Sequence, residues 1–549
     1  MKKHLSYLIL LTGLVLYGCK GKEKADLIVY NALVHTVDGQ MSKADGFAIR
    51  DGKFLEVGDG AALLEKYESV AQLDMQRKTI VPGFVDAHTH LIGLAERIQQ
   101  ADLREAMSME GIVEQLEQYK QKYPDRQWLV GWGWDQNKWT DKTMPTKKLL
   151  DEKFPNVAVV LKRIDGHAVL VNQKALDLAG ITAQTTVSGG SIELQNGKLT
   201  GLLLEDPAFN LVLSKLPQPN DTEWAEMLFA AQKKCLEVGL TTISEAGLDK
   251  KTVDLLEKLE KENKLKLRIY AMLNPTDENK KHYLAKGPYN TGRVNVRSFK
   301  VYADGALGSR GACLLAPYSD KPDTRGVMQK TPKELEDLYN EIAPKGFQIN
   351  THCIGDSAVR AVLDIYGKIL KGTNDKRWRI EHAQVVHPQD INKFKQFSVL
   401  ASVQPQHVSS DWKWAKDRLG PDRVKYAYVF KDLMVQNGQI AFGSDFPVVP
   451  ENPIYTFHAA VSRTDENFEP DGGYMPEQIM DKPTALKALT IWSAFANFEE
   501  KDKGSIEAGK FADFVVLDTD ILDTDNLLLR NTMILRTFIN GEEVYKNEQ

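Results

Sequence analysis

The sequence predicts an α/β fold, in which a (β/α)8 barrel of the TIM type carries a composite β-sandwich domain from both termini and an inserted α/β subdomain. Three observations support this prediction. Eight short apolar runs in the middle of the chain alternate with segments of helical periodicity. Both ends of the chain are rich in strand-like runs and turns. Two further strand-like runs interrupt the barrel pattern after its first strand.

The barrel is predicted to span residues 81–504. Its strands are short apolar runs, and helix-period segments lie between most of them, for example 224–238 and 332–342. The eight strands are expected at 81–87, 241–244, 267–272, 298–302, 347–350, 378–380, 399–403 and 440–442.

The terminal β domain is predicted from residues 26–80 together with 505–549. Near the N-terminus, Asp51-Gly52 separates two strand-like runs, which is a hairpin signal. Near the C-terminus, Asn540-Gly541 separates two more. Because both ends show the same pattern around a long middle, we expect one discontinuous β domain.

An inserted subdomain is predicted at residues 105–220. The strand-like runs 128–132 and 157–161 exceed the eight that a barrel needs. Both fall between the first and the second barrel strand, so we place them in an insertion there.

The composition is that of an ordinary globular protein. The chain has 549 residues, of which 42% are hydrophobic and 26% charged, and its formal net charge is -5. This balance shows no basic footprint, so we expect no nucleic-acid partner. The sparse cysteines Cys235, Cys313 and Cys353 argue against a disulfide framework.

Residues 1–18 are predicted to be a lipoprotein signal peptide. A basic start precedes an apolar run that is too short for a comfortable membrane span, and the run ends in Gly18-Cys19. Cleavage would leave Cys19 as a lipid anchor, with 19–25 as a tether. The alternative is an ordinary secretory signal with a chance cysteine. We expect a cell-envelope lipoprotein that faces the periplasm or is anchored to the outer membrane.

The ends of the predicted barrel strands carry side chains that bind metals. His88 and His90 end the first strand, two residues apart, so their imidazoles are expected to point the same way. Barrel active sites lie at the C-terminal ends of the strands. The other strand ends supply Lys300, His352, His382 and Asp445.

Each of these residues alone has another explanation. Lys300 could be a solvated lysine, His352 or His382 a hydrogen-bonded core histidine, and Asp445 a helix cap. All of them fall at the same end of a barrel strand, however, and this joint placement favours a metal centre.

Four further segments stand out in the sequence: Phe299–Arg310, Thr351–Asp356, Gly443–Val448 and Gly504–Asp513. With them, the chain resembles the amidohydrolase superfamily, and within it the branch that contains N-substituted formamide deformylase. The resemblance covers nearly the whole mature chain.

The resemblance implies a binuclear centre. His88, His90 and Asp445 would bind one divalent metal and His352 and His382 the other, with Lys300 as a bridging N6-carboxylysine. A carbamate is an anionic oxygen ligand, whereas an ammonium group repels metals. Zinc is the expected metal, although manganese or iron would also fit. A mononuclear site with unmodified Lys300 stays open.

The implied activity is hydrolysis of a C–N bond other than a peptide bond, in an amide, N-acyl or N-formyl compound. The metals would lower the pKa of a bridging water from about 16 toward about 7. Asp445 would act as general base and then as acid. His407, after strand seven, is a candidate donor to the carbonyl or oxyanion. The alternatives are an ester, lactone or phosphoester hydrolase, and a non-catalytic lipid-anchored binding protein.

Substrate-contacting residues are harder to predict. Trp134 and His167 of the insertion could form a lid or pocket, or Trp134 could belong to the core of the insertion. Arg310 could pair with a substrate carboxylate or brace its loop. Glu245, which ends strand two, could support packing or contact the site directly. A small molecule is the expected partner, and a homodimer is a further candidate assembly.

Overall fold

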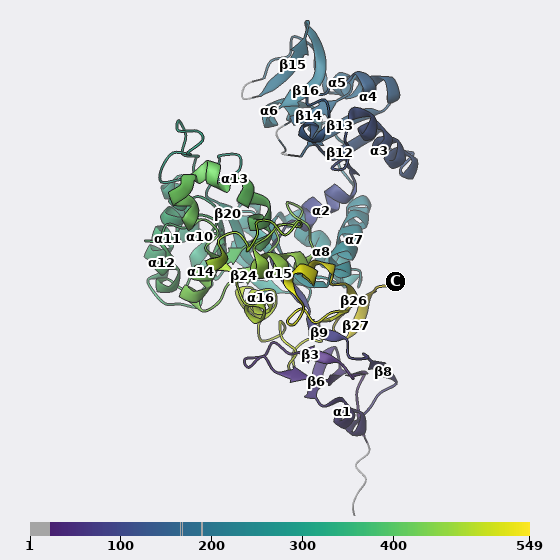
Figure 1. Cartoon of the computed structure of the whole chain (residues 1–549), viewed down its shortest axis with the longest axis vertical. Coiled ribbons are helices and arrows are strands. Elements are labelled where there is room, and N and C mark those ends of the chain that lie inside the picture. Colours follow the sequence, from purple (N-terminus) through teal and green to yellow (C-terminus); the bar gives the residue numbers. More distant parts are fainter. Residues whose placement is uncertain (1–21, 165, 167, 188–189, 549) are drawn as a thin grey trace, which may run out of the picture.

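The protein is described by a computed structural model that covers residues 22–548 except 165, 167, 188 and 189. The expected signal peptide, Cys19 and His167 lie outside these described residues. The inserted subdomain, the barrel and the terminal β domain follow one another along the long axis (Figure 1). Among the described helices, none is long and apolar enough to cross a bilayer.

The barrel consists of eight strands that pair in parallel in chain order. Backbone hydrogen bonds join its first and last segments: the Asp445 N–H donates to His88 O and the His90 N–H to Phe446 O, each at 2.8 Å. The predicted fold class is therefore confirmed. The strands are β10 (Phe84–Thr89), β17 (Leu240–Leu248), β18 (Arg268–Leu273), β20 (Val294–Tyr302), β21 (Gln348–Cys353), β22 (Arg379–His382), β23 (Leu400–Val403) and β24 (Ala441–Phe442).

The first predicted strand, 81–87, is divided in the structure. Its beginning belongs to β9 (Thr79–Pro82) of the terminal domain, and its end to β10. The break falls at Gly83, whose N–H donates to Asp513 O at 2.9 Å. A Cβ at Gly83 would lie 2.3 Å from Thr241 Oγ1, so only glycine fits where the chain passes from one domain into the next.

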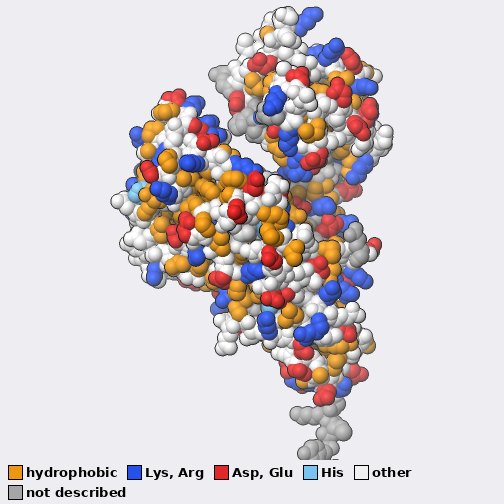
Figure 2. All heavy atoms as spheres, in the orientation of Figure 1, with side chains coloured by type: hydrophobic (Ala, Val, Ile, Leu, Met, Phe, Trp, Pro, Cys, Tyr) orange, Lys and Arg blue, Asp and Glu red, His pale blue; other side chains and the backbone are white. Residues whose placement is uncertain are grey.

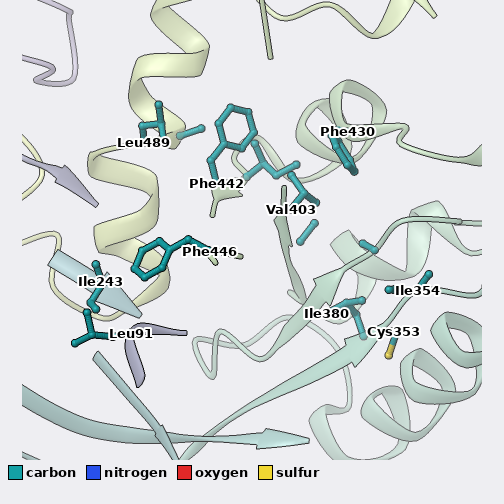
Figure 3. Packing of buried hydrophobic residues seen from close by; sticks show 14 of the residues in the cluster. Leu91, Ile243, Cys353, Ile354, Ile380, Val403, Phe430, Phe442, Phe446 and Leu489 are labelled. Atoms are coloured by element: carbon teal, nitrogen blue, oxygen red, sulfur yellow. The ribbon is translucent and has the colours of Figure 1, made fainter. Parts of the chain in front are cut away.

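The hydrophobic layer of the barrel lies between the strands and the helices that surround them. Figure 3 shows part of it, with Ile380, Val403 and Phe442 from neighbouring segments in one buried cluster. Helix α7 (Asp221–Glu237) packs here and begins with a capping box formed by Asn220 and its third helical residue. Fully burying one such apolar side chain stabilises the fold by about 1.5–3 kcal/mol.

Polar groups close the N-terminal end of the barrel. Arg379, the first residue of β22, donates to Ala496 O at 2.6 Å, and Gln348, the first of β21, donates to the same carbonyl at 2.9 Å. Lys503 and Glu499 form a buried ion pair at 2.9 Å close by in sequence. The end of α17 (Ile491–Ala496) and the residues after it therefore fill this end, which leaves the C-terminal end for a site.

The terminal domain is a sandwich of two sheets built from both ends of the chain. Phe47 of one sheet and Phe514 of the other pack with ring centroids 4.9 Å apart. The turns at Asp51-Gly52 and Asn540-Gly541 have positive φ at both residues, as two-residue hairpin turns require. One sheet contains β6 (Lys53–Gly58), β5 (Gly46–Arg50), β2 (Leu27–Tyr30) and β8 (Ala71–Asp74). The other contains β27 (Glu542–Lys546), β26 (Ile534–Ile539), β25 (Phe514–Leu517), β9, β3 (Leu33–His35) and β4 (Lys43–Ala44).

The insertion follows α2 (Leu91–Ile98) and has a mixed sheet of its own. Its first strand starts at Ala101, before the predicted boundary at 105. Separate apolar clusters cover the two faces of the sheet. Its strands, in spatial order, are β11 (Ala101–Asp102), β12 (Trp128–Trp134), β13 (Ala158–Arg163), β14 (Ala168–Val171), β16 (Lys198–Leu204) and β15 (Ser191–Gln195). Its helices are α3 (Met109–Lys122), α4 (Lys148–Lys153), α5 (Gln173–Ala179) and α6 (Asp206–Leu213).

Candidate metal centre

The structure brings the residues predicted as metal ligands together at the C-terminal end of the barrel. They are His88, His90, Lys300, His352, His382 and Asp445. His88 Nε2 lies 2.8 Å from Lys300 Nζ, and His90 Nε2 lies 3.1 Å from Asp445 Oδ1. The ring centroid of His382 lies 4.8 Å from that of His88 and 4.4 Å from that of His352.

Two of these residues reach the site through an unusual backbone conformation. On a regular strand His382 would face away from its neighbour Glu381. Its φ of 74° breaks the alternation, and Asp445 has a φ of 66° just after β24. A left-handed conformation of a residue other than glycine costs about 1–3 kcal/mol and persists where the surroundings fix it. Both deviations occur at candidate ligands.

His88, His382 and Asp445 form a compact group within the site. Their ligand atoms lie within 4.8 Å of one another, and all three residues are buried. Burial alone would raise the pKa of Asp445, but the hydrogen bond from His90 and the nearby imidazoles hold it well below its ordinary value. A buried carboxylate among imidazoles is a donor set that suits zinc.

The fully buried amine of Lys300 also differs from an ordinary lysine. Burial lowers the pKa of Lys300 and outweighs the opposing effect of nearby carboxylates such as Glu381 and Asp445. A lower pKa increases the fraction of neutral amine, which is the form that can act as a nucleophile.

Two hydrogen-bond acceptors that contact candidate ligands were missed by the sequence interpretation. Glu381 Oε2 lies 2.5 Å from His88 Nδ1, and Gln404 Oε1 lies 2.8 Å from His382 Nδ1. Burial alone would raise the pKa of Glu381, but His88 and Arg379 lower it below its ordinary value. The one available signal was position: Glu381 precedes a candidate ligand, and Gln404 directly follows a barrel strand.

Further buried carboxylates fix the loops that carry the ligands. Glu245 accepts hydrogen bonds from the backbone N–H groups of Leu91 at 2.5 Å and Ile92 at 3.1 Å, so it anchors the start of α2 directly after His90. This contact favours the packing role for Glu245. Asp304 accepts three backbone N–H groups at 2.8–3.0 Å, and burial raises its pKa to about 7.

His407 lies beside the candidate metal ligands. It belongs to α13 (Pro405–Arg423), and its Nε2 is 3.7 Å from Asp445 Oδ2. Its ring stacks parallel to that of His382 with centroids 6.2 Å apart. Within the described part of the chain, this buried nitrogen has no hydrogen-bond partner, so it is free to donate to a bound molecule.

Two of the three predicted substrate residues make contacts of their own within the protein. Trp134 is fully buried in the insertion, and its Nε1 donates to Leu161 O at 2.8 Å, which favours the core role. Arg310 donates to both carboxylate oxygens of Asp320, at 3.1 and 2.7 Å, which favours the loop brace. His167 is outside the described residues.

One arginine connects the insertion to the site. Arg97 of α2 stacks on Trp132 of β12, 3.6 Å from the ring centroid, and donates to Pro447 O. Pro447 lies two residues after Asp445. Figure 2 shows a hollow between the insertion and the part of the barrel that carries α13.

Comparisons with known proteins agree with this geometry. The chain is 33% identical over 530 residues to the putative amidohydrolase YtcJ of Bacillus subtilis, covering 94% of this chain and 99% of that protein. It is 27% identical over 535 residues to N-substituted formamide deformylase of Arthrobacter pascens, covering 94% of this chain and 97% of that enzyme. It is 32% identical over 539 residues to the Arabidopsis thaliana protein LONG AFTER FAR-RED 3, covering 95% and 92%.

A solved structure and a family match complete the comparison. An uncharacterized metal-dependent hydrolase from Pyrococcus horikoshii OT3 superimposes with a TM-score of 0.77 at 28% identity, covering 91% of this chain and 99% of that one. The family described as "Amidohydrolase family" matches residues 73–545. The resemblance seen in the sequence is thus confirmed, and the chain belongs to the amidohydrolase family.

Proposed function

We propose that this protein is a metal-dependent hydrolase that cleaves a C–N bond other than a peptide bond, in an N-acyl or N-formyl amide. The observation that carries the proposal is the convergence of four histidines, a lysine and an aspartate at one end of the barrel. The choice of bond is supported by the similarity to N-substituted formamide deformylase along almost the whole chain.

The donor set fits two divalent ions, with zinc as the first choice. His88, His90 and Asp445 would hold one ion, and His352 and His382 the other. Lys300, carboxylated on Nζ, would bridge them. Its buried amine of lowered pKa supports this role, because carboxylation requires the neutral amine to attack carbon dioxide. When bound, such ions lower the pKa of water and polarise a carbonyl group.

The side chains of the protein supply the proton transfers. Asp445 is the only carboxylate among the six proposed ligands, and its two oxygens face different partners, with Oδ1 toward His90 and Oδ2 toward His407. We assign to it the removal of a proton from the attacking water and its delivery to the leaving amine. His407 Nε2 is the donor to the carbonyl oxygen of the substrate as negative charge develops there.

The test is an assay of purified, zinc-loaded protein against N-substituted formamides and other amides, beside esters, lactones and phosphotriesters. We expect amide hydrolysis that His88→Ala abolishes. The matched control is His282→Ala, which changes an exposed histidine on α9 (Asp277–Lys286).

Turnover of esters or phosphotriesters without any amide would contradict the proposed bond. A protein that binds no transition metal, and whose His88→Ala variant behaves like the wild type, would contradict catalysis altogether and favour a binding protein.

A further inference from the structure

We infer that Glu381 and Gln404 are positioning residues, which determine the ring nitrogen that His88 and His382 present to the centre. This inference rests on the proposed metal-dependent function. A histidine binds a metal through a nitrogen that carries no proton, and the bond made by its other nitrogen selects which one that is. The structure places one dedicated acceptor on each of these two rings.

The two nitrogens of His88 face different chemical groups. Nδ1 is 2.5 Å from Glu381 Oε2, whereas Nε2 is 2.8 Å from Lys300 Nζ and 3.6 Å from Asp445 Oδ1. A carboxylate can only accept, so Nδ1 carries the proton and Nε2 presents its lone pair to the centre. His88 and Glu381 both have 0% exposed side chains, so solvent does not reach this bond.

Glu381 also lies next to a buried arginine. Its other oxygen, Oε1, lies 3.8 Å from Arg379 Nη1. Arg379 in turn donates to Ala87 O at 3.3 Å and to Ala496 O at 2.6 Å. The carboxylate therefore lies between a buried cation and the imidazole of His88, and among the described residues its hydrogen bond is to His88 alone, because Oε1 has no hydrogen-bond partner.

Gln404 is the hydrogen-bond acceptor for Nδ1 of His382, and unlike Glu381 it carries no charge. Its Oε1 accepts from Nδ1 of His382 at 2.8 Å, so Nε2 of that ring is left to bind a metal. The amide nitrogen of Gln404 has no hydrogen-bond partner among the described residues. The contact of Oε1 with His382 is therefore the one that orients the amide. In the proposed assignment, His88 and His382 belong to different metal ions, so each ion has one positioned ligand.

The experiment compares paired substitutions in the full-length protein. Glu381→Gln and Gln404→Glu keep an oxygen acceptor, whereas Glu381→Leu and Gln404→Leu remove it. The matched control is Gln406→Leu, which removes a buried glutamine two residues further along the chain, in α13, that donates to Pro450 O and Thr456 Oγ1 and contacts no candidate ligand through these bonds. Zinc affinity is measured by competition with a fluorescent chelator, and thermal unfolding is measured without metal.

We expect the two leucine variants to bind zinc about 10–100-fold more weakly, because losing the partner of a ligating histidine has effects of this size. The acceptor-keeping variants should stay closer to the wild type, and Gln406→Leu should bind zinc like the wild type. Because Glu381→Leu also leaves Arg379 without its carboxylate and can impair folding, the neutral Gln404 pair decides the matter. Metal-free Gln404→Leu and Gln406→Leu should unfold at similar temperatures.

Wild-type zinc affinity in Gln404→Leu, or an equal loss in Gln406→Leu, would overturn the inference. Failure of the proposed function looks different: wild-type protein that binds no zinc would remove the basis of both proposals. Wild-type protein that binds zinc but cleaves no amide would overturn only the choice of bond.

Discussion

Replacement of Lys300 tests the proposed bridge between the two metal ions. Lys300→Ala removes the amine that lies 2.8 Å from His88 Nε2 in a fully buried position. If the lysine carries the bridging carbamate, this change removes the one anionic ligand that both ions share. We expect zinc content to fall from two equivalents toward one, and kcat/KM to fall at least 1,000-fold, which corresponds to about 4 kcal/mol of transition-state stabilisation.

Lys300→Ala should also lower the free energy of unfolding. Truncating a long buried side chain to alanine leaves a cavity, which costs about 2–5 kcal/mol. Lys300→Met nearly keeps the volume and removes the amine, so we expect it to preserve the stability of the metal-free protein. It should nevertheless lose zinc and activity as Lys300→Ala does. The comparison separates loss of the ligand from loss of packing.

The assay measures bound zinc by elemental analysis and kcat/KM on the best amide substrate, with and without added acetate or propionate. A short carboxylate can enter the cavity of Lys300→Ala and replace the missing anionic oxygens, so we expect it to restore at least tenfold in kcat/KM. It should restore nothing in Lys300→Met, where the methionine fills the space. If both variants keep two equivalents of zinc and wild-type kcat/KM, the bridging role of Lys300 is refuted.

Three further predictions concern other residues. His407→Asn should lower kcat by about 100–1,000-fold, the usual cost of losing an oxyanion donor, at unchanged zinc content, and an unchanged kcat would exclude this role. Arg310→Ala and Asp320→Ala should each lower the thermal unfolding temperature and change kcat/KM less than tenfold. A large rise in KM for Arg310→Ala alone would instead indicate substrate contact. Because burial raises the pKa of Asp304 to about 7, well above its unfolded value, the folded protein binds the extra proton between about pH 4 and pH 7. As the pH rises through this range, the free energy of unfolding of the metal-free protein should therefore fall, by up to about 1.4 kcal/mol per pH unit from this group. In urea titrations at several pH values, the unfolding free energy of Asp304→Asn should depend less steeply on pH.

Much of the fold could be predicted because the barrel repeats one simple pattern. Each buried parallel strand is a short apolar run, so the positions of strands such as β20 and β21 are visible in the sequence. The division at Gly83 was not visible, because β9 and β10 are both apolar and the exchange of sheet partners leaves no mark in the pattern. It depends instead on Thr241 and Asp513, which are distant in sequence.

The convergence of the candidate ligands could be predicted because they occupy equivalent places, at the ends of strands. Glu381 and Gln404 could not, since their roles depend on which nitrogen of a distant ring they meet. Glu381 contacts His88 across 293 positions of sequence. The role of Trp134 was equally hidden, because an aromatic residue in an insertion can face a ligand or its own core, and only the packing of the insertion decides between them.

The most direct test of the metal centre is a crystal structure of the zinc-loaded protein with anomalous diffraction data collected at the zinc edge. The proposed arrangement predicts two anomalous peaks, one between His88, His90 and Asp445 and one between His352 and His382, with density for a carboxylate on Lys300 Nζ between them. Anomalous peaks that lie away from these side chains would contradict it, and so would a fully loaded protein without any peak at this end of the barrel.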